Sequence, residues 1–222
     1  MNIQEFTFNL FQEKTRILWK DADKAVIVDP GFCDEQEKKE FYDFLDKQSL
    51  IPCAILLTHA HADHIFGVWE LQQKYAIPVY MNPEDEMTFH MSELMSGRMG
   101  FPPIRTDWKT TPLDEDGMTL SVGGFCFRVI LTPGHSPGSV CYYEQSEEIL
   151  LSGDTLFAGT IGRTDLEGSD YDKEILSIME KLTVLPPQTR VLPGHGPQST
   201  IGIERCSNPF LEPFNEKDEM TI

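Results

Sequence analysis

The sequence of 222 residues lacks several features that would assign it to common classes of protein. Its five cysteines form no Cys-x-x-Cys pair, which argues against a disulfide framework and against a closed thiolate metal site. It contains no run of eighteen apolar residues, so no membrane-spanning helix is expected. The N-terminal segment lacks the basic-then-apolar pattern of a secretory signal. Together these absences predict a cytoplasmic protein with reduced cysteines.

Basic residues are also scarce. The chain carries 18 lysines and arginines against 36 aspartates and glutamates, which gives a formal net charge of −18. A field of this sign repels phosphate backbones and anionic lipid surfaces. We therefore expect neither nucleic acid nor a membrane as a partner, and a small molecule as the substrate. The sequence leaves the oligomeric state open.

The chain does have an apolar fraction of 40%, arranged as strand-like runs that alternate with helical ones. Residues 6–10 alternate and predict a half-buried strand, and "CAILLT" (53–58) is typical of a strand covered on both faces. Asp34 is placed to cap the helix that follows it. These alternations predict an α/β fold in a single domain over residues 1–222. Residues 85–111 are rich in methionine and aromatic residues, which suits either a helix with a core-covering loop or an apolar lid over a site.

Three of the six histidines fall within "THAHADHIFG", residues 58–67. His59, His61 and His64, together with Asp63, form the pattern His-x-His-x-Asp-His directly after a predicted strand. A polar loop whose side chains cap turns is the simpler alternative, but it does not explain so many imidazoles in six positions. This spacing predicts a metal site.

Three further candidates follow strand-like runs in the same way. They are His135 in "TPGHSPGS", Asp154 in "LLSGDTLF" and His195 in "LPGHGP". In open α/β folds, the loops after the strands carry the ligand-binding groups, so we expect these side chains to meet the first four. His90 lacks such a context and is expected to be an ordinary helix-surface or packing residue.

The seven candidate ligands are too many for one tetrahedral ion and fit two. Neutral imidazole and carboxylate suit divalent zinc, iron and manganese, and we take Zn²⁺ as the first expectation, with Fe and Mn as alternatives. Two ions that share a bridging carboxylate and a bridging hydroxide would provide a nucleophile at neutral pH and would polarise a carbonyl group.

The motifs "IVDPG", "THAHADH", "TPGHSPGS", "SGDTLF" and "PGHGP", in this order, resemble the metallo-β-lactamase fold superfamily of metal-dependent hydrolases over nearly the whole chain. The resemblance implies an αββα sandwich of two mixed β-sheets flanked by helices, with the metals at one edge. It also implies that Asp29 braces the metal loops through hydrogen bonds. The ligand sets that it implies are His59, His61 and His135 for one ion, Asp63, His64 and His195 for the other, and Asp154 as the bridge.

Within the superfamily, "GTIGRTDLEGSD" followed by "PGHGPQSTIGIERCSNPFL" is similar to short hydroxyacylglutathione hydrolases, or glyoxalase II. Aspartate at position 154 matches thioesterase-like members and differs from the class of lactamases that uses cysteine there. The resemblance implies cleavage of an S-acyl thioester, with Asp63 also orienting or deprotonating the nucleophile. Arg163 is the best candidate to bind an anionic substrate. The alternative is that Arg163 pairs with Asp165 or Asp170 and fixes its own loop.

Other functions stay open at this point. "GRTD" (162–165) also resembles the persulfide dioxygenases, which hold one iron and consume oxygen. A non-catalytic metal-binding module is an alternative from a different class, and it would have no open coordination position. Hydrolysis of β-lactams is weaker, because it rests on the fold alone.

Overall fold

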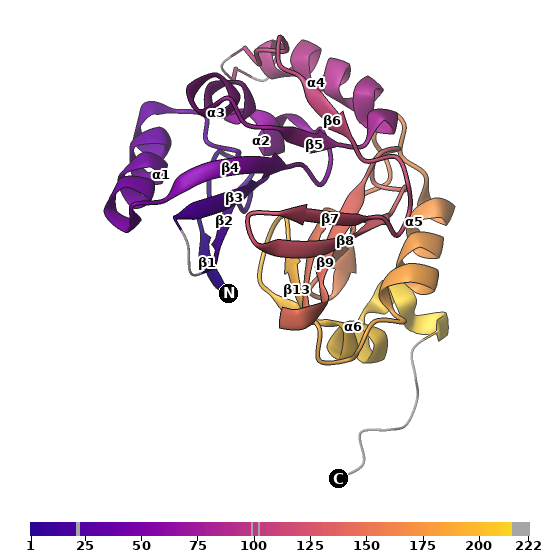
Figure 1. Cartoon of the computed structure of the whole chain (residues 1–222). Helices are drawn as coiled ribbons and strands as arrows, with labels where there is room; N and C mark the ends of the chain where they lie inside the picture. The colour runs from indigo at the N-terminus through magenta and orange to yellow at the C-terminus, as the bar shows by residue number, and fades with distance from the viewer. Residues whose placement is uncertain (21–22, 99, 102, 215–222) are drawn as a thin grey trace.

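The computed structural model describes residues 1–20, 23–98, 100–101 and 103–214, and two six-stranded sheets form its centre (Figure 1). In the first sheet the order is β1-β2-β3-β4-β5-β6. Antiparallel pairing joins β1, β2 and β3, and parallel pairing joins β3 to β6, so this sheet is mixed. Its strands are β1 (Asn2–Glu5), β2 (Arg16–Trp19), β3 (Lys24–Val28), β4 (Ile51–Leu56), β5 (Val79–Met81) and β6 (Thr110–Pro112).

The second sheet has the order β14-β13-β10-β9-β8-β7. Only β10 and β13 pair in parallel, so this sheet is mixed as well. The short hairpin β11–β12 follows β10. The strands are β7 (Thr119–Val122), β8 (Phe125–Leu131), β9 (Val140–Glu144), β10 (Ile149–Gly153), β11 (Leu156–Phe157), β12 (Thr160–Ile161), β13 (Arg190–Pro193) and β14 (Ser199–Thr200).

Helices lie on the outside of both sheets (Figure 1). Those of the N-terminal half are α1 (Glu35–Gln48), α2 (Ala62–Ile65), α3 (Val68–Tyr75) and α4 (Glu86–Arg98), with the 3-10 turn η1 (Pro83–Asp85) before α4. Those of the C-terminal half are α5 (Tyr171–Ser177), its π-helical continuation η3 (Ile178–Leu182) and α6 (Ile201–Ser207), with the 3-10 turns η2 (Gln145–Glu147) and η4 (Pro209–Phe214). No helix in the described part of the chain is long and apolar enough to cross a membrane.

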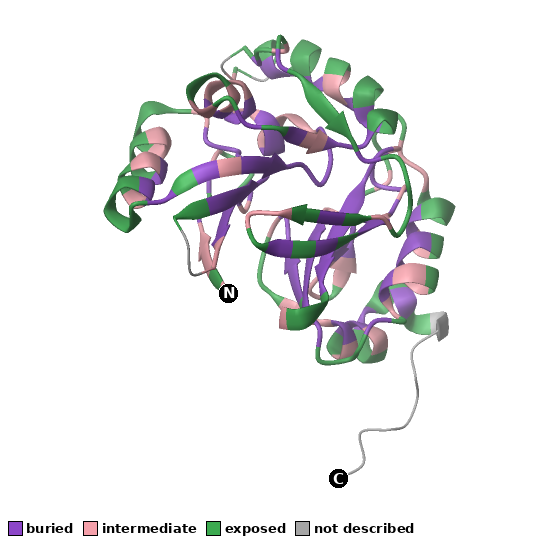
Figure 2. Cartoon of the chain, in the orientation of Figure 1, coloured by how far each residue is buried: buried purple, intermediate pink, exposed green. Residues whose placement is uncertain are grey.

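Three apolar layers hold the four layers of secondary structure together, and buried residues line the strands in Figure 2. Strand β3 shows how the sequence builds them, because successive side chains of a strand point to opposite faces. Ala25 and Ile27 pack toward α1 and α3, while Val26 and Val28 pack between the two sheets. The third layer lies between the second sheet and the helices α5, η3 and α6. The predicted αββα sandwich is confirmed.

The strand predicted at residues 6–10 is wrong. Phe6 and Phe8 are buried as the alternation suggests, but Leu10 is 85% exposed. The backbone turns at Asn9, whose φ of 52° is left-handed. The side-chain amide of Asn9 fixes the turn, because its Nδ2 donates to the carbonyls of Gly31 and Asp63. The turn therefore ties the N-terminus to the predicted metal loop.

Two other expectations can be compared with the structure. Asp34 caps α1, because its side chain accepts hydrogen bonds from the amides of Gln36 and Glu37. In the segment 85–111, α4 is followed by the buried residues Ile104 and Trp108, which fits a helix with a core-covering loop. Residues 99 and 102 of this segment lie outside the described residues, and a role as a lid stays a prediction.

Candidate metal centre

All seven predicted ligands lie just beyond the ends of central strands. The loop with His59, His61, Asp63 and His64 follows β4 and leads into α2. The other three follow one strand each: His135 comes after β8, Asp154 after β10 and His195 after β13. The two sheets thus bring to one edge residues that are up to 136 positions apart in the sequence, from His59 to His195.

The first group consists of His59, His61 and His135. Three ligand atoms, one from each residue, lie within 4.8 Å of one another. Nδ1 of His61 is 2.9 Å from Nε2 of His135, and the buried Nε2 of His59 has no hydrogen-bond partner. Burial, together with the neighbouring imidazoles, lowers the pKa of His61 to about 3 and that of His59 well below its usual value. Both rings are therefore neutral and offer a lone pair, as a metal ligand must.

The second group consists of Asp63, His64 and His195. Nε2 of His195 lies 3.2 Å from Oδ2 of Asp63 and 3.3 Å from Nε2 of His64. Burial disfavours the charged form of each of these groups, but the attraction between imidazoles and carboxylates outweighs it. The nearby histidines lower the pKa of Asp63, and the carboxylates of Asp63 and Asp154 raise the pKa of His64 and of His195. Without a metal, this group holds protons that a divalent cation would displace.

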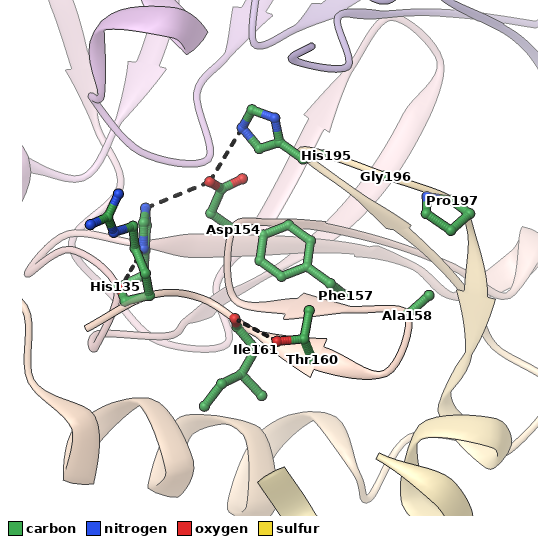
Figure 3. Close-up of a pocket in the computed structure, with 10 residues that line it drawn as sticks. His135, Asp154, Phe157, Ala158, Thr160, Ile161, His195, Gly196 and Pro197 are labelled. Carbon is green, nitrogen blue, oxygen red and sulfur yellow. Dashed lines mark hydrogen bonds and ion pairs between the residues drawn. The ribbon is translucent and has the colours of Figure 1, made fainter. Parts of the chain in front are cut away.

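Asp154 stands between the two groups. Its Oδ2 is 3.7 Å from Nε2 of His135 and 3.4 Å from Nε2 of His195, as the dashed lines of Figure 3 indicate. Its Oδ1 is buried without a hydrogen-bond partner and lies 3.5 Å from Nε2 of His64. Orphaned lone pairs that converge in this way are costly unless a cation or a proton satisfies them. The donor set therefore fits two divalent cations, and its nitrogen and oxygen atoms suit zinc, iron or manganese.

A second layer of hydrogen bonds orients these side chains. Nδ1 of His135 bonds to the carbonyl of Arg163, and Nδ1 of His195 bonds to the carbonyl of Phe11, both at 2.9 Å. Asp29 accepts from the amide and the hydroxyl of Thr58, at 2.8 and 2.6 Å. Such partners fix the ring orientation and the tautomer of metal-binding histidines. The bracing role expected for Asp29 agrees with these contacts.

Three buried acids at the site were not predicted from the sequence. Asp85 accepts hydrogen bonds from the amides of Ala60 and Gly138, at 2.6 and 2.8 Å, and so joins the two ligand loops. Glu174 of α5 accepts from the amide of His135 at 2.9 Å. Glu13 shares a third cluster with Asp29 and His64. Isolated acids in helices and turns carry no motif that would have singled them out.

A cleft of about 360 Å³ opens beside the metal centre (Figure 3). It is lined by His135, Asp154, His195, Phe157, Ala158, Thr160, Ile161, Arg163, Gly196 and Pro197. Arg163 thus reaches the cleft as predicted for a substrate contact, but it also forms two hydrogen bonds to Asp165, at 2.7 and 2.8 Å, as the alternative predicted. His90 is on α4 with 60% of its side chain exposed, outside the cluster, as expected.

Comparison with known proteins agrees with this geometry. The family model described as the metallo-beta-lactamase superfamily matches residues 17–195. The hydroxyacylglutathione hydrolase GloC of Haemophilus influenzae is 34% identical over 212 residues, which cover 95% of this chain and 98% of that protein.

Two solved structures are also similar. The B3 metallo-β-lactamase BLEG-1 is 40% identical, with a TM-score of 0.84 over 95% of this chain and 99% of that one. TTHA1623 in a di-iron-bound form is 38% identical, with a TM-score of 0.82 over 94% of this chain and 100% of that one.

A match across both sheets and all four ligand loops establishes the family. The chain belongs to the metallo-β-lactamase superfamily. Curated relatives of the chain include a probable metallo-hydrolase of Bacillus subtilis and the hydroxyacylglutathione hydrolase GloC, and the histidine and aspartate cluster of this chain suits divalent metal ions.

Proposed function

We propose that the protein hydrolyses a small S-acyl thioester, as a glyoxalase II-like enzyme with two divalent ions, Zn²⁺ before Fe or Mn. The observation that carries the proposal is the seven-residue donor set, with Asp154 in the bridging place, beside an open cleft. The 34% identity to a hydroxyacylglutathione hydrolase along 95% of the chain supports it.

The residues that line the cleft favour a thioester over an ester or an amide. Apart from the proposed ligands, the described lining residues provide only Arg163 and the hydroxyl of Thr160 as side-chain hydrogen-bond donors, and neither is acidic enough to protonate a leaving group at neutral pH. A leaving group must therefore depart largely as an anion. A thiolate does so readily because a thiol has a pKa of about 8.5, whereas an alkoxide or an amine anion does not.

Metal ions held by this donor set would polarise the thioester carbonyl and lower the pKa of a bound water. The protein side chains position these groups. Asp63, whose Oδ2 lies 3.2 Å from Nε2 of His195, stays ionised because its pKa is lowered, so it can accept a hydrogen bond from the attacking water and orient it. Arg163, which lines the cleft and has an exposed side chain, would contact a carboxylate on the substrate.

A panel of substrates tests the proposal on protein whose metal content has been measured. Thioester hydrolysis without oxygen, with about two ions per chain, is the expected result. Oxygen uptake with a persulfide and one iron per chain would instead indicate a dioxygenase, and metal without turnover of any substrate would indicate a binding module.

Hydrolysis of β-lactams is a second candidate, because a solved structure described as a B3 metallo-β-lactamase is 40% identical to this chain. A β-lactam therefore belongs in the panel. We expect its kcat/KM to lie well below that of the best thioester, because no described lining residue apart from the proposed ligands can protonate the departing nitrogen at neutral pH.

A further inference from the structure

We propose that the apolar wall of the cleft, formed by Phe157, Ala158 and Pro197, binds an uncharged apolar group of the substrate directly beside the scissile bond. This inference rests on the proposed thioester hydrolysis and names the class of thioester. The group belongs either to the acyl half or to the thiol half of the substrate. In both cases the wall would contact an uncharged apolar group.

The apolar wall comes from two of the ligand loops, because Phe157 and Ala158 follow Asp154 and Pro197 follows His195. Asp154 is followed directly by the hairpin β11–β12, in which Phe157 pairs with Thr160 and Leu156 with Ile161. The centre of the Phe157 ring lies 6.4 Å from the centre of the His195 ring. Figure 3 shows Phe157 among the groups that surround the opening. A substrate whose reacting carbon lies at the metal centre would therefore place its next few atoms against this wall.

The chemistry of the wall selects apolar groups. The side chains of Phe157, Ala158 and Pro197 offer neither a hydrogen-bond donor nor an acceptor. Burial of an apolar group against them is favourable in proportion to the area removed from water. The cleft volume of about 360 Å³ exceeds the ~150 Å³ that holds a benzene molecule in an apolar protein cavity. A branched or aromatic group of moderate size therefore fits.

The charges around the cleft disfavour a substrate with many negative groups. Apart from the proposed ligand histidines, Arg163 is the only cationic residue among the described residues that line the cleft, and two hydrogen bonds hold it to Asp165. The net charge of −18 adds a long-range field that repels anions. An uncharged apolar half beside the reacting centre, with at most one carboxylate near Arg163, agrees with both observations.

Two series of thioesters test the proposal on metal-loaded protein. In the first, the acyl group of N-acetylcysteamine thioesters is lengthened from acetyl to hexanoyl and phenylacetyl. In the second, the acetyl group is fixed and the thiol is lengthened from ethyl to butyl and benzyl. We expect kcat/KM to rise roughly threefold to fourfold per methylene in one series, equivalent to about 0.8 kcal/mol. The series that rises shows which half contacts the wall.

Variants connect the effect to the apolar wall. Phe157→Ala should remove most of the gain with chain length, while Phe157→Leu should retain most of the gain. Tyr171→Ala, which removes an exposed aromatic ring of α5 outside the cleft, should match the wild-type protein. If Phe157→Ala does not fold, Pro197→Asp at the exposed end of the wall should reduce the gain. Equal slopes in the wild-type and variant proteins would overturn the proposal.

Binding without turnover separates this inference from the proposed function. Calorimetry measures the affinity of metal-loaded protein for butanoate and hexanoate. We expect hexanoate to bind about tenfold more tightly to the wild-type protein, and the difference to disappear in Phe157→Ala. If this difference is found but no thioester is cleaved, the proposed function fails and the apolar wall stands. If thioesters are cleaved but length has no effect on rate or affinity, the apolar wall fails and the function stands.

Discussion

Nδ1 of His64 lies 3.1 Å from Oδ2 of Asp29, and both side chains are almost completely buried. Nε2 of the same His64 ring faces Asp63, Asp154 and His195. Asp29 also accepts two hydrogen bonds from Thr58, the residue before His59. One buried carboxylate therefore orients His64 in the second group and fixes the start of the loop that carries the first.

The link between Asp29 and His64 predicts a selective loss of metal affinity. Asp29→Asn should weaken binding at the second group by 10- to 100-fold, the usual effect of removing a carboxylate behind a metal-binding histidine. The first group should change less, because Asp29 reaches His59 only through Thr58 and the partner of His135 is the carbonyl of Arg163, whereas His64 faces Asp29 directly. Competition with a chelator measures both affinities. Asp114→Asn, at an exposed position, is the matched control, and unchanged affinity in Asp29→Asn would contradict the bracing role.

Gly194 predicts a steric effect on the site. A Cβ atom at Gly194 would lie 2.1 Å from Oδ1 of Asp154 and 2.7 Å from Cε1 of His64, closer than atoms can approach. Gly194→Ala should therefore displace ligands of the second group, lower the metal content from about two ions per chain toward one, and reduce turnover at least tenfold. Gly97→Ala on α4 is the control, since nothing lies within 4 Å of its Cβ and alanine favours helix. Elemental analysis of both purified variants makes the comparison, and normal metal content in Gly194→Ala would show that the cluster is not arranged as described.

The two groups should respond differently to acid. Metal and protons compete for the second group because the pKa values of His64 and His195 are raised, whereas the pKa values of His59 and His61 are lowered. As the pH falls from 7.5 to 5, the ion of the second group should leave first. Metal content after dialysis at each pH would show a fall from about two ions to about one. Simultaneous loss of both ions would disprove this difference.

Glu174 predicts how stability depends on pH in the metal-free protein. Burial raises the pKa of Glu174 from 4.5 to about 8, against the hydrogen bond that it accepts from the amide of His135. Between these two pH values the folded chain keeps a proton that the unfolded chain has lost, so the free energy of unfolding falls as the pH rises. The contribution of Glu174 to this slope is at most about 1.4 kcal/mol per pH unit.

Urea denaturation in a chelating buffer between pH 4.5 and 8 measures this effect. Wild-type protein should lose stability relative to Glu174→Gln as the pH rises, because the variant has no ionisable group at this position. Glu180→Gln, at an exposed position near the end of the same helical segment, should follow the wild-type curve. Parallel curves for wild-type protein and Glu174→Gln would mean that Glu174 is ionised throughout.

The sequence predicted the part of the site that is encoded locally. His59, His61, Asp63 and His64 lie within six residues, and each of the other three ligands follows a recognisable strand and turn. Convergence then follows from the sheet architecture, because neighbouring parallel strands such as β10 and β13 end at the same edge.

The features that the sequence did not predict depend mainly on contacts between segments that are distant in the sequence. Glu174 acts on His135 from 39 positions away, and Asp85 acts on Gly138 from 53. Residues 6–10 misled the pattern analysis because alternation cannot detect a left-handed backbone at Asn9. The two interpretations of Arg163 could not be separated from the sequence either, since the side chain both lines the cleft and pairs with Asp165.

The most direct test of the account is the number of metal ions per chain in the double variant His59→Ala/His61→Ala, measured by native mass spectrometry alongside thioester turnover. His90→Ala, which removes an exposed histidine outside the cluster, is the control. We predict about two ions and full turnover in the wild-type protein and the control, and loss of the first group's ion together with turnover in the double variant. A double variant that keeps both ions, or that hydrolyses the substrate at the wild-type rate, would contradict the account.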